Sequence, residues 1–329
     1  MKTLKRQIAV VAGATRGAGR GIARALGEAG ATVYCTGRSI RGKPSPYARP
    51  ETIEETAELV SAAGGTGISV RVDHTIETEV KRLFERVGGK HHRLDVLVNC
   101  VAGEDATFTC WNHSLCEVEV DQGLALMRQA VFSHLLAAKH AAPLMMRRRR
   151  GLIIEVTDRD TLVYQGYGVM HDLVKATIIR LAFIMAAELR QYRIAALAVT
   201  PGYLRSESML QRFGVTEENW RDAGKKDPNF LESETPLFVG RCIAALAADP
   251  KVLERSGDAI GAWELGKEYC IADADGRRPN VVKIFQSSPA LQKNFRHELQ
   301  WLHRFERRAR RYAGKQLTTE TQRPPSKIK

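Results

Sequence analysis

Residues 8–30, IAVVAGATRGAGRGIARALGEAG, constrain the fold of this chain more than any other stretch. Four apolar residues predict a buried parallel strand, and a glycine-rich turn and a helix with one apolar face follow. The turn has the spacing Gly13-x-x-x-Gly17-x-Gly19. Side chains would clash where the backbone turns tightly and approaches a pyrophosphate, which the free amides of the helix N-terminus stabilise. The stretch therefore predicts a dinucleotide site, with a purely structural strand–turn–helix as the alternative.

Strands and helices are predicted to alternate along most of the chain. Apolar runs predict further strands at residues 31–37, 67–73, 94–99, 151–157, 194–202 and 266–276. Helices are expected near residues 54–63, 77–87, 118–147, 170–191 and 236–248. The alternation is typical of a doubly wound parallel sheet of the Rossmann type, an α/β fold with three layers, α/β/α. Such sheets bind ligands at the carboxyl ends of their strands, and several distinctive residues fall there: Gly13 to Gly19, Arg38, Asp73, Asn99, Thr157, Asp158, Pro201 and Gly202.

Composition indicates a globular protein without a membrane span. Of the 329 residues, 44% are hydrophobic and 26% are charged, which is ordinary for a soluble domain. No apolar run approaches the roughly 18 residues that a bilayer span requires. The N-terminal residues lead straight into the first strand, so no signal peptide is expected. The six cysteines show no metal-ligand spacing, and we expect reduced thiols, no metal and a cytoplasmic location.

The chain divides into a main domain and a basic extension. Residues 1–280 form the expected dinucleotide-binding domain, in which the polar insertion 203–233 suits a mobile substrate lid. Residues 281–329 carry 12 Lys and Arg against 3 Asp and Glu. Within them, residues 289–312 predict an amphipathic helix, and residues 318–329 predict disorder. The basic charge leaves open a nucleic acid or an anionic membrane surface as partner. Packing of the apolar stripe on the core or on a second subunit is the favoured interpretation.

Taken together, these features resemble the short-chain dehydrogenase/reductase family over residues 5–279. The family's glycine turn corresponds to GATRGAGRG, and its adenine-contacting acidic residue corresponds to Asp73. Its Asn-Asn-Ala-Gly motif is partly kept as NCVAG from Asn99, and its Pro-Gly pair is Pro201-Gly202. The resemblance implies a nicotinamide cofactor held by Gly13, Thr15, Arg16, Gly17, Ala18, Gly19, Arg38, Asp73, Asn99, Lys175, Pro201 and Gly202.

Charge near the adenosine ribose favours NADP(H) over NAD(H). An acidic residue at the end of the second strand would accept from a ribose 2′-hydroxyl and repel a 2′-phosphate. Here that strand ends at Arg38, and Arg16 lies inside the glycine turn. Two guanidinium groups favour a phosphate, unless Arg38 is only a solvated surface charge.

The catalytic positions depart from the family pattern. The family places a Tyr four residues before a Lys on the helix after strand five, a Ser thirteen residues before that Tyr, and an Asn on the preceding helix. Here Lys175 matches, but His171 stands at the Tyr position and Asp158 at the Ser position, with Thr157 beside it. No Asn occurs between residues 121 and 151.

Three hypotheses account for the substituted centre. In the favoured one, the chain reduces a carbonyl or oxidises an alcohol on a small organic substrate. His171 then exchanges the proton, Asp158 orients it, and Thr157 replaces the Ser hydroxyl. Tyr164 or Tyr167 could reach the same site. In the second hypothesis, these residues perform non-redox acid–base chemistry such as dehydration or isomerisation. In the third, the chain is a nucleotide-binding pseudoenzyme.

Other polar residues and the long helices predict structural roles. We expect His134 to be a satisfied core histidine, His74 to lie at the surface and residues 147–150 to form a solvated turn. The family commonly forms dimers or tetramers through its long helices. Residues 118–147 and 170–191 suit such a homo-oligomer.

Overall fold

The computed structural model describes residues 3–43, 49–102, 113–158 and 167–287. Residues Met1–Leu162 and Tyr167–Lys283 form one compact unit. The sheet and the site lie within this unit. The predicted amphipathic helix 289–312, the predicted disordered tail 318–329 and Tyr164 lie outside the described residues. None of the helices in the described ranges combines the length and hydropathy that crossing a membrane requires.

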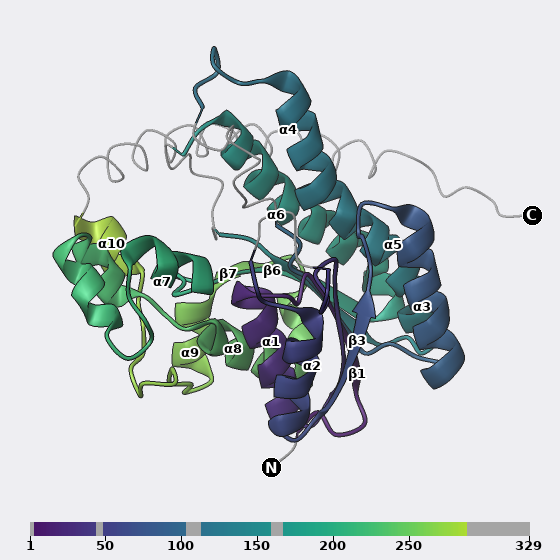
Figure 1. Ribbon diagram of the computed structural model, residues 1–329. Helices are drawn as coiled ribbons and strands as arrows, with labels where there is room; N and C mark the ends of the chain where they lie inside the picture. The colour runs from purple at the N-terminus through teal and green to yellow at the C-terminus, as the bar shows by residue number, and fades with distance from the viewer. Residues whose placement is uncertain (1–2, 44–48, 103–112, 159–166, 288–329) are drawn as a thin grey trace, which may run out of the picture. The chain divides into compact units, whose positions relative to one another are not determined.

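A parallel sheet forms the centre of the unit (Figure 1). Within the described residues its strand order is β3-β2-β1-β4-β5-β6-β7, the order of a doubly wound fold. Apolar, fully buried residues fill the central strands, because helices cover both faces of a parallel sheet. The strands are β1 (Ile8–Ala12), β2 (Thr32–Gly37), β3 (Thr66–Arg71), β4 (Val96–Asn99), β5 (Gly151–Val156), β6 (Ile194–Thr200) and β7 (Ala259–Gly261).

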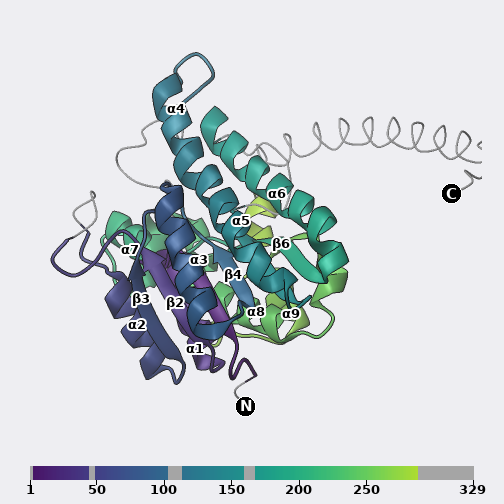
Figure 2. The same cartoon turned by 90° about the vertical axis from the view of Figure 1, so that its right-hand side faces the viewer.

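Helices form a layer on each face of the sheet. One hydrophobic core joins the sheet to α1 (Gly17–Glu28), α2 (Ile53–Ala62), α8 (Pro236–Ala248) and α9 (Ala262–Glu268). A second core joins the other face to α3 (Glu77–His91), α5 (Ser133–Met146) and α6 (Val169–Leu189), which lie side by side in Figure 2. The three-layer α/β/α prediction is therefore confirmed. A further helix, α10, spans Val282–Ser287.

The long helix predicted at residues 118–147 contains a π turn. It divides into α4 (Val120–Met127), the π turn η2 (Arg128–Phe132) and α5. A π turn adds a residue to one helical turn and often occurs at functional sites. In this chain it follows α4 directly and carries Gln129, whose amide oxygen accepts from Arg38.

One predicted strand is wrong. Residues 266–276 were expected to form the last strand, but they contain the end of α9 and a turned segment. The edge strand is β7, three residues that pair with β6 from Ala198↔Ala259 to Thr200↔Gly261. A strand this short has too few residues to show an alternation of side chains, so the sequence pattern did not reveal it.

The insertion 203–233 has a small core of its own. It folds into α7 (Glu207–Phe213) and the 3-10 turns η4 (Trp220–Lys225) and η5 (Pro228–Glu232). Trp220, Ala223 and Phe230 are buried together, and Tyr203 and Phe213 pack against them. The predicted polar insertion is therefore an ordered aromatic subcore next to the carboxyl end of β6. Two further 3-10 turns, η3 (Arg190–Tyr192) and η6 (Val252–Arg255), connect other elements.

Candidate active site

The glycine turn between β1 and α1 needs glycine for two separate reasons. Gly13 and Gly17 have φ angles of +85° and +53°, a left-handed conformation that side chains rarely adopt. A Cβ atom on Gly19 would lie 2.0 Å from the Gly13 carbonyl oxygen, and one on Gly13 would lie 2.6 Å from that of Cys100. The backbone is thus packed too tightly for any side chain at these positions, which opens the amides of α1 to a ligand.

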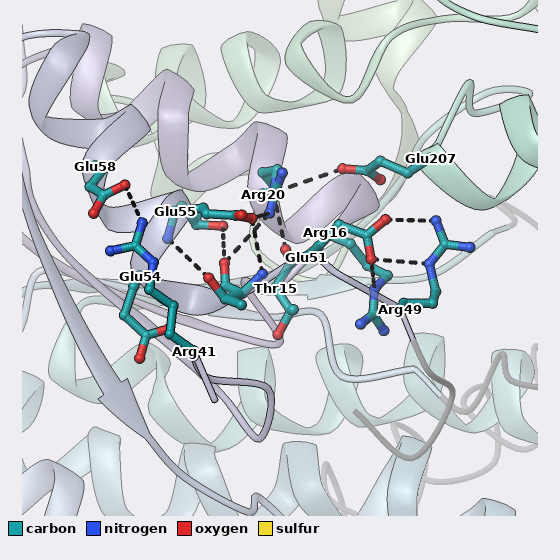
Figure 3. Close-up of polar contacts among 12 residues, drawn as sticks. Thr15, Arg16, Arg20, Arg41, Arg49, Glu51, Glu54, Glu55, Glu58 and Glu207 are labelled. Atoms are coloured by element: carbon teal, nitrogen blue, oxygen red, sulfur yellow. Dashed lines mark hydrogen bonds and ion pairs between the residues drawn. The ribbon is translucent and has the colours of Figure 1, made fainter. Parts of the chain in front are cut away.

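The first amide of α1 already binds an anion. The Gly17 N–H donates to Glu207 Oε2 at 2.8 Å. Arg20 lies 3.8 Å from the other carboxylate oxygen of Glu207, as Figure 3 shows. A carboxylate on a helix N-terminus is favourable because the helix dipole and the free amides attract negative charge. The turn therefore fits a phosphate group. Thr15 and Ala18 lie in the same turn, where Arg20 Nε donates to the Thr15 carbonyl at 3.0 Å.

Two arginines meet on one carboxylate beside this turn. Arg16 Nε lies 3.1 Å from Glu51 Oε2, and Arg49 donates to both oxygens of Glu51 at 3.1 and 2.6 Å (Figure 3). Burial alone would raise the pKa of Glu51, but the hydrogen bonds and charges of Arg49 and Arg16 outweigh it and lower that pKa. The buried Nη2 of Arg16 has no hydrogen-bond partner among the described residues. It is a donor that fits a further phosphate oxygen.

This arrangement depends on how α2 begins. The Thr52 hydroxyl accepts from the Glu55 amide at 3.3 Å, and the Glu55 carboxylate accepts from the Thr52 amide at 3.1 Å. Such a capping box fixes the first helical turn and is worth about 1 kcal/mol. Glu55 also accepts from Arg20 at 2.8 Å, so the start of α2 is tied to α1. Glu51, the residue before the cap, is thereby held beside Arg16.

Arg38 and Asp73 lie together at the ends of β2 and β3. Arg38 Nη1 is 4.0 Å from Asp73 Oδ2, and Arg38 Nη2 donates to Gln129 at 3.5 Å. Burial opposes ionisation of Asp73, but hydrogen bonds from Thr75 and the Arg38 charge leave its pKa below the ordinary value. Asp73 therefore stays ionised as an acceptor, and Arg38 is a third guanidinium at this end of the sheet.

Asn99 belongs to a buried network rather than to an open surface. Its amide donates to Glu155 Oε1 at 2.7 Å and to the His134 carbonyl at 3.2 Å. His134 Nε2 contacts the Val101 carbonyl at 2.9 Å, and its Nδ1 contacts Glu155 Oε2 at 2.6 Å. Since a carbonyl only accepts, Nε2 carries hydrogen, and the Nδ1–Glu155 contact shares one further proton. The prediction that His134 is a satisfied core histidine is confirmed, and Asn99 positions the end of β4.

Three of the predicted catalytic side chains meet at the end of β5. His171 Nε2 lies 2.7 Å from Asp158 Oδ2, and Lys175 Nζ lies 3.6 Å from the same oxygen. The spacing of four residues places His171 and Lys175 on one face of α6, as expected. All three are largely removed from water, with 15%, 32% and 7% of the His171, Asp158 and Lys175 side chains exposed. The arrangement couples an imidazole, a carboxylate and an ammonium group.

Thr157 and Tyr167 border this cluster. The Thr157 hydroxyl is buried and has no hydrogen-bond partner within the described ranges. The Tyr167 and His171 rings pack in a T-shaped arrangement, with 5.3 Å between the ring centroids. Tyr167 itself is 49% exposed. The site thus offers one buried hydroxyl and one half-exposed aromatic ring for substrate.

The Pro201-Gly202 pair follows β6 and lies against a buried acid. A Cβ atom on Gly202 would approach Glu234 Oε2 to 2.8 Å. Glu234 is 1% exposed. Burial, with the Asp273 charge, raises its pKa to about 8, although the Gly202 amide and Arg205 oppose the shift. The neutral, protonated form of Glu234 is therefore favoured, next to a predicted cofactor-binding turn.

His74 does not lie at the surface, where the sequence predicted it. It is 3% exposed, and its Nε2 lies 2.8 Å from the Thr36 hydroxyl. That hydroxyl donates its hydrogen to the Val11 carbonyl, so His74 Nε2 is the donor. Burial, followed by repulsion from His134, lowers the pKa of His74 to about 4. The predicted solvated turn at residues 147–150 is exposed as expected.

The sequence did not point to Glu207, Glu51, Arg49, Glu155 or Glu234. Charged residues in loops and edge helices usually lie in water. Glu207 and Glu155 reach their partners only through the tertiary fold, as does Glu51 in its contact with Arg16. The tertiary fold also buries Glu234 beside Gly202, whereas Arg49 and Glu51 lie only two positions apart in the sequence. A signal was present for Glu155 alone, because an acidic residue inside the apolar run of β5 requires a buried partner.

The fold and the glycine turn together define a dinucleotide-binding protein of the doubly wound α/β class. Residues 7–214 match the family model of the short chain dehydrogenases. A Mus musculus protein named dehydrogenase/reductase SDR family member 1 is 35% identical over 306 residues, which cover 92% of this chain and 93% of that protein. The chain belongs to the short-chain dehydrogenase/reductase family, whose fold implies a nicotinamide dinucleotide cofactor.

Solved structures of the same fold agree with this assignment. A short-chain type dehydrogenase/reductase from Mycobacterium marinum has a TM-score of 0.63 at 21% identity and covers 78% of this chain and 94% of its own. The reductase YwfH has a TM-score of 0.64 at 18% identity, over 78% of this chain and 97% of its own. At these identities the likeness concerns the fold alone.

Proposed function

We propose that the chain is an NADP(H)-dependent oxidoreductase that interconverts a carbonyl and an alcohol on a small organic substrate, with His171 in place of the family Tyr. The observation that carries the proposal is the 2.7 Å contact between His171 Nε2 and Asp158 Oδ2, with Lys175 at 3.6 Å. The mouse relative is named as a dehydrogenase/reductase, which supports redox chemistry. When bound, the dinucleotide supplies or accepts the hydride.

Asp158 determines which nitrogen of His171 exchanges the proton. An ionised carboxylate only accepts, so Nε2 carries hydrogen toward Asp158 and Nδ1 is the exchanging atom. In alcohol oxidation Nδ1 takes the hydroxyl proton, and the Asp158 charge stabilises the imidazolium that forms. In carbonyl reduction Nδ1 returns that proton to the oxygen. The pair thus acts as the acid–base group in either direction.

Lys175 and Thr157 complete the proposed roles. The Lys175 ammonium balances the Asp158 carboxylate and would also bind a ribose hydroxyl of the dinucleotide, the role that the family assigns to this Lys. The buried Thr157 hydroxyl donates to the substrate oxygen in place of the family Ser. Residues Gly13, Thr15, Gly17, Ala18, Gly19, Pro201 and Gly202 provide the backbone that holds the pyrophosphate and the nicotinamide end.

Turnover of His171 and Asp158 variants tests the catalytic proposal. Spectrophotometric assays with NADPH on a panel of carbonyl compounds compare wild type with His171→Ala, Asp158→Asn and His140→Ala. We expect kcat to fall by about 100-fold or more in the first two, the usual contribution of a positioned acid–base group. His140→Ala is the matched control, because His140 lies on α5 and contacts Glu77 of α3, outside the proposed site.

Three results would contradict parts of this proposal. Activity that survives in His171→Ala would assign the proton exchange to another residue. A wild type that binds NADPH but turns over only after His171→Tyr would favour a non-redox or nucleotide-binding role. If the protein binds neither NADPH nor NADH, the glycine turn is not a dinucleotide site.

NADP(H) preference is proposed to rest on three arginines. Arg16 and Arg38 were expected from the sequence, and the structure adds Arg49 beside Arg16. Guanidinium groups bind a dianionic 2′-phosphate through paired charge-assisted hydrogen bonds. Glu51 holds Arg16 and Arg49 in place while no phosphate is present.

Fluorescence titration with NADPH and NADH tests this preference. Arg16→Gln and Arg49→Gln should each weaken NADPH binding by about ten-fold, since one charge-assisted hydrogen bond is worth about 1.5 kcal/mol or more. NADH binding should hardly change. Arg41→Gln is the control, because Arg41 pairs with Glu58 on the exposed side of α2. An equal loss for both nucleotides would contradict the 2′-phosphate assignment.

A further inference from the structure

Helix α7 touches the cofactor-binding turn through two side chains on one face. Glu207 Oε2 accepts from the Gly17 N–H at 2.8 Å, and Gln211 Oε1 accepts from Arg49 Nη1 at 2.7 Å. Residues four apart lie one above the other on a helix. The two contacts therefore form one row, which runs from the N-terminus of α1 to the arginine pair around Glu51.

The backbone that leads into α7 also lies against the turn. A Cβ atom on Gly17 would be 3.6 Å from Ser206 Cβ and 4.0 Å from Leu204 Cδ2, which is ordinary van der Waals contact. Ser206 caps α7 by accepting from the Met209 amide. Leu204 and Ser206 therefore lie near Gly17, on the side to which a Cβ atom would point, in addition to the Glu207 hydrogen bond.

These contacts use the groups that a dinucleotide phosphate needs. The Gly17 amide has a single hydrogen, and Glu207 now accepts it. A pyrophosphate brought to the same amide would meet the Glu207 carboxylate at close range, where two negative charges repel each other. Arg49 likewise divides its donors between Glu51 and Gln211.

We propose that α7 is a displaceable latch, in which Glu207 and Gln211 occupy the phosphate-binding groups until the dinucleotide displaces them. The proposal rests on the proposed function, because it takes the dinucleotide as the competing ligand. Glu207 acts as a built-in competitor that lowers cofactor affinity, and Gln211 makes a smaller, uncharged contribution.

Displacement of α7 carries the rest of the insertion with it. Met209, Leu210 and Phe213 of α7 pack against the buried cluster of Trp220, Ala223 and Phe230. Moving these side chains together keeps their apolar surface buried, whereas separating them would expose it to water. Cofactor binding would therefore shift the whole of residues 203–233, the segment that the sequence suggested as a substrate lid.

Cofactor titrations of α7 variants test the latch. Fluorescence titration with NADPH compares wild type, Glu207→Gln, Glu207→Ala and Gln211→Ala. The matched control is Glu218→Gln, an exposed residue of the same insertion that does not cap α1. We expect Kd to fall by about ten-fold in Glu207→Ala, less in Glu207→Gln, about two-fold in Gln211→Ala and not at all in the control. Unchanged or weaker binding by both Glu207 variants would overturn the latch.

Hydrogen–deuterium exchange gives a second readout that does not depend on activity. On addition of NADPH to wild type, amides of residues 204–213 should exchange faster, because α7 leaves its contacts. Slower exchange there would mean that α7 closes onto the cofactor, and it would overturn the proposal.

The same experiments separate the latch from the proposed function. If wild type and both Glu207 variants fail to bind NADPH and NADH, the cofactor assignment itself is wrong. If the wild type binds and the Glu207 variants bind no better, only the latch fails. Binding that appears only after Glu207→Ala supports both.

Discussion

At the residue scale, replacing the family Tyr by His171 changes what its neighbours must do. A phenol has a pKa near 10 and needs a cationic neighbour to ionise at neutral pH, whereas an imidazole titrates near neutrality without one. The imidazole instead needs an acceptor that fixes its tautomer, and Asp158 provides one at 2.7 Å. In the proposed mechanism Lys175, 3.6 Å from the same carboxylate, neutralises Asp158 instead of activating a phenol. The two substitutions, Tyr to His and Ser to Asp, therefore belong together.

The buried acid Glu234 should make folding stability depend on pH. Its pKa rises from 4.5 to about 8 on folding, so the folded chain keeps a proton that the unfolded chain releases. The contribution to stability is full below pH 4.5 and is lost as pH rises to about 8, at about 1.4 kcal/mol per pH unit for one proton. Urea unfolding between pH 5 and 8.5 measures this slope.

Glu234→Gln supplies the comparison for that measurement. The amide keeps the size of the side chain and cannot ionise, so most of the slope above pH 5 should disappear. The variant should then be more stable than wild type at pH 8. Parallel pH profiles for the two proteins would show that Glu234 is ionised and paired in the folded state.

At the element scale, the sequence predicts the central strands and most helices because each is long and apolar enough to show its period. Helix α8 was expected at residues 236–248 and occurs there. The strand β7 was missed because three residues carry no pattern. The position of the π turn η2 also had no local signal, since it depends on how α4 and α5 pack on the sheet.

The candidate site was predictable only where chain spacing determines geometry. Lys175 and His171 are four residues apart on one helix, and Thr157 and Asp158 directly follow one strand, so local rules place them. Glu207 meets Gly17 across 190 positions of sequence. No local rule predicts such a contact, because it depends on where the chain leaves β6 relative to the N-terminus of α1.

The crossing of α1 and α8 should respond sharply to one methyl group. A Cβ atom on Gly240 would lie 2.5 Å from the Gly21 carbonyl oxygen. That oxygen belongs to the backbone of α1 and cannot move aside as a flexible side chain could. Gly240→Ala should therefore lower the free energy of unfolding by about 1–3 kcal/mol, the usual cost of overpacking. Gly89→Ala on α3 is the control, because a Cβ there meets nothing within 4 Å.

The control is expected to change stability in the opposite direction. Alanine favours a helix over glycine by up to about 1 kcal/mol, so Gly89→Ala should unfold at slightly higher urea. Both effects are read from urea midpoints at constant m-value. Equal midpoints for wild type and Gly240→Ala would mean that α1 and α8 separate at little cost.

At the scale of the whole molecule, the helices of one face carry apolar side chains that the sheet does not cover. On α4, η2 and α5 these are Val120, Leu124, Phe132 and Leu135, and on α6 they are Leu173, Phe183 and Ile184, each at least 40% exposed. Exposed apolar side chains gathered on neighbouring helices are typical of a protein interface. We therefore propose that the chain forms a dimer or tetramer through these helices, as expected from the family.

Leu124→Glu should dissociate that oligomer without unfolding the chain. Leu124 is 64% exposed in the single chain, so a carboxylate there remains in water in the monomer. In an oligomer it would be buried without a partner, which is costly. Light scattering after size exclusion should give a mass of two or four chains for wild type and of one chain for the variant.

Leu59→Glu on α2, across the sheet from these helices, should keep the wild-type mass. If Leu124→Glu also keeps it, the chain associates through another surface or not at all, and the exposed apolar side chains of α4 and α6 then require a different partner.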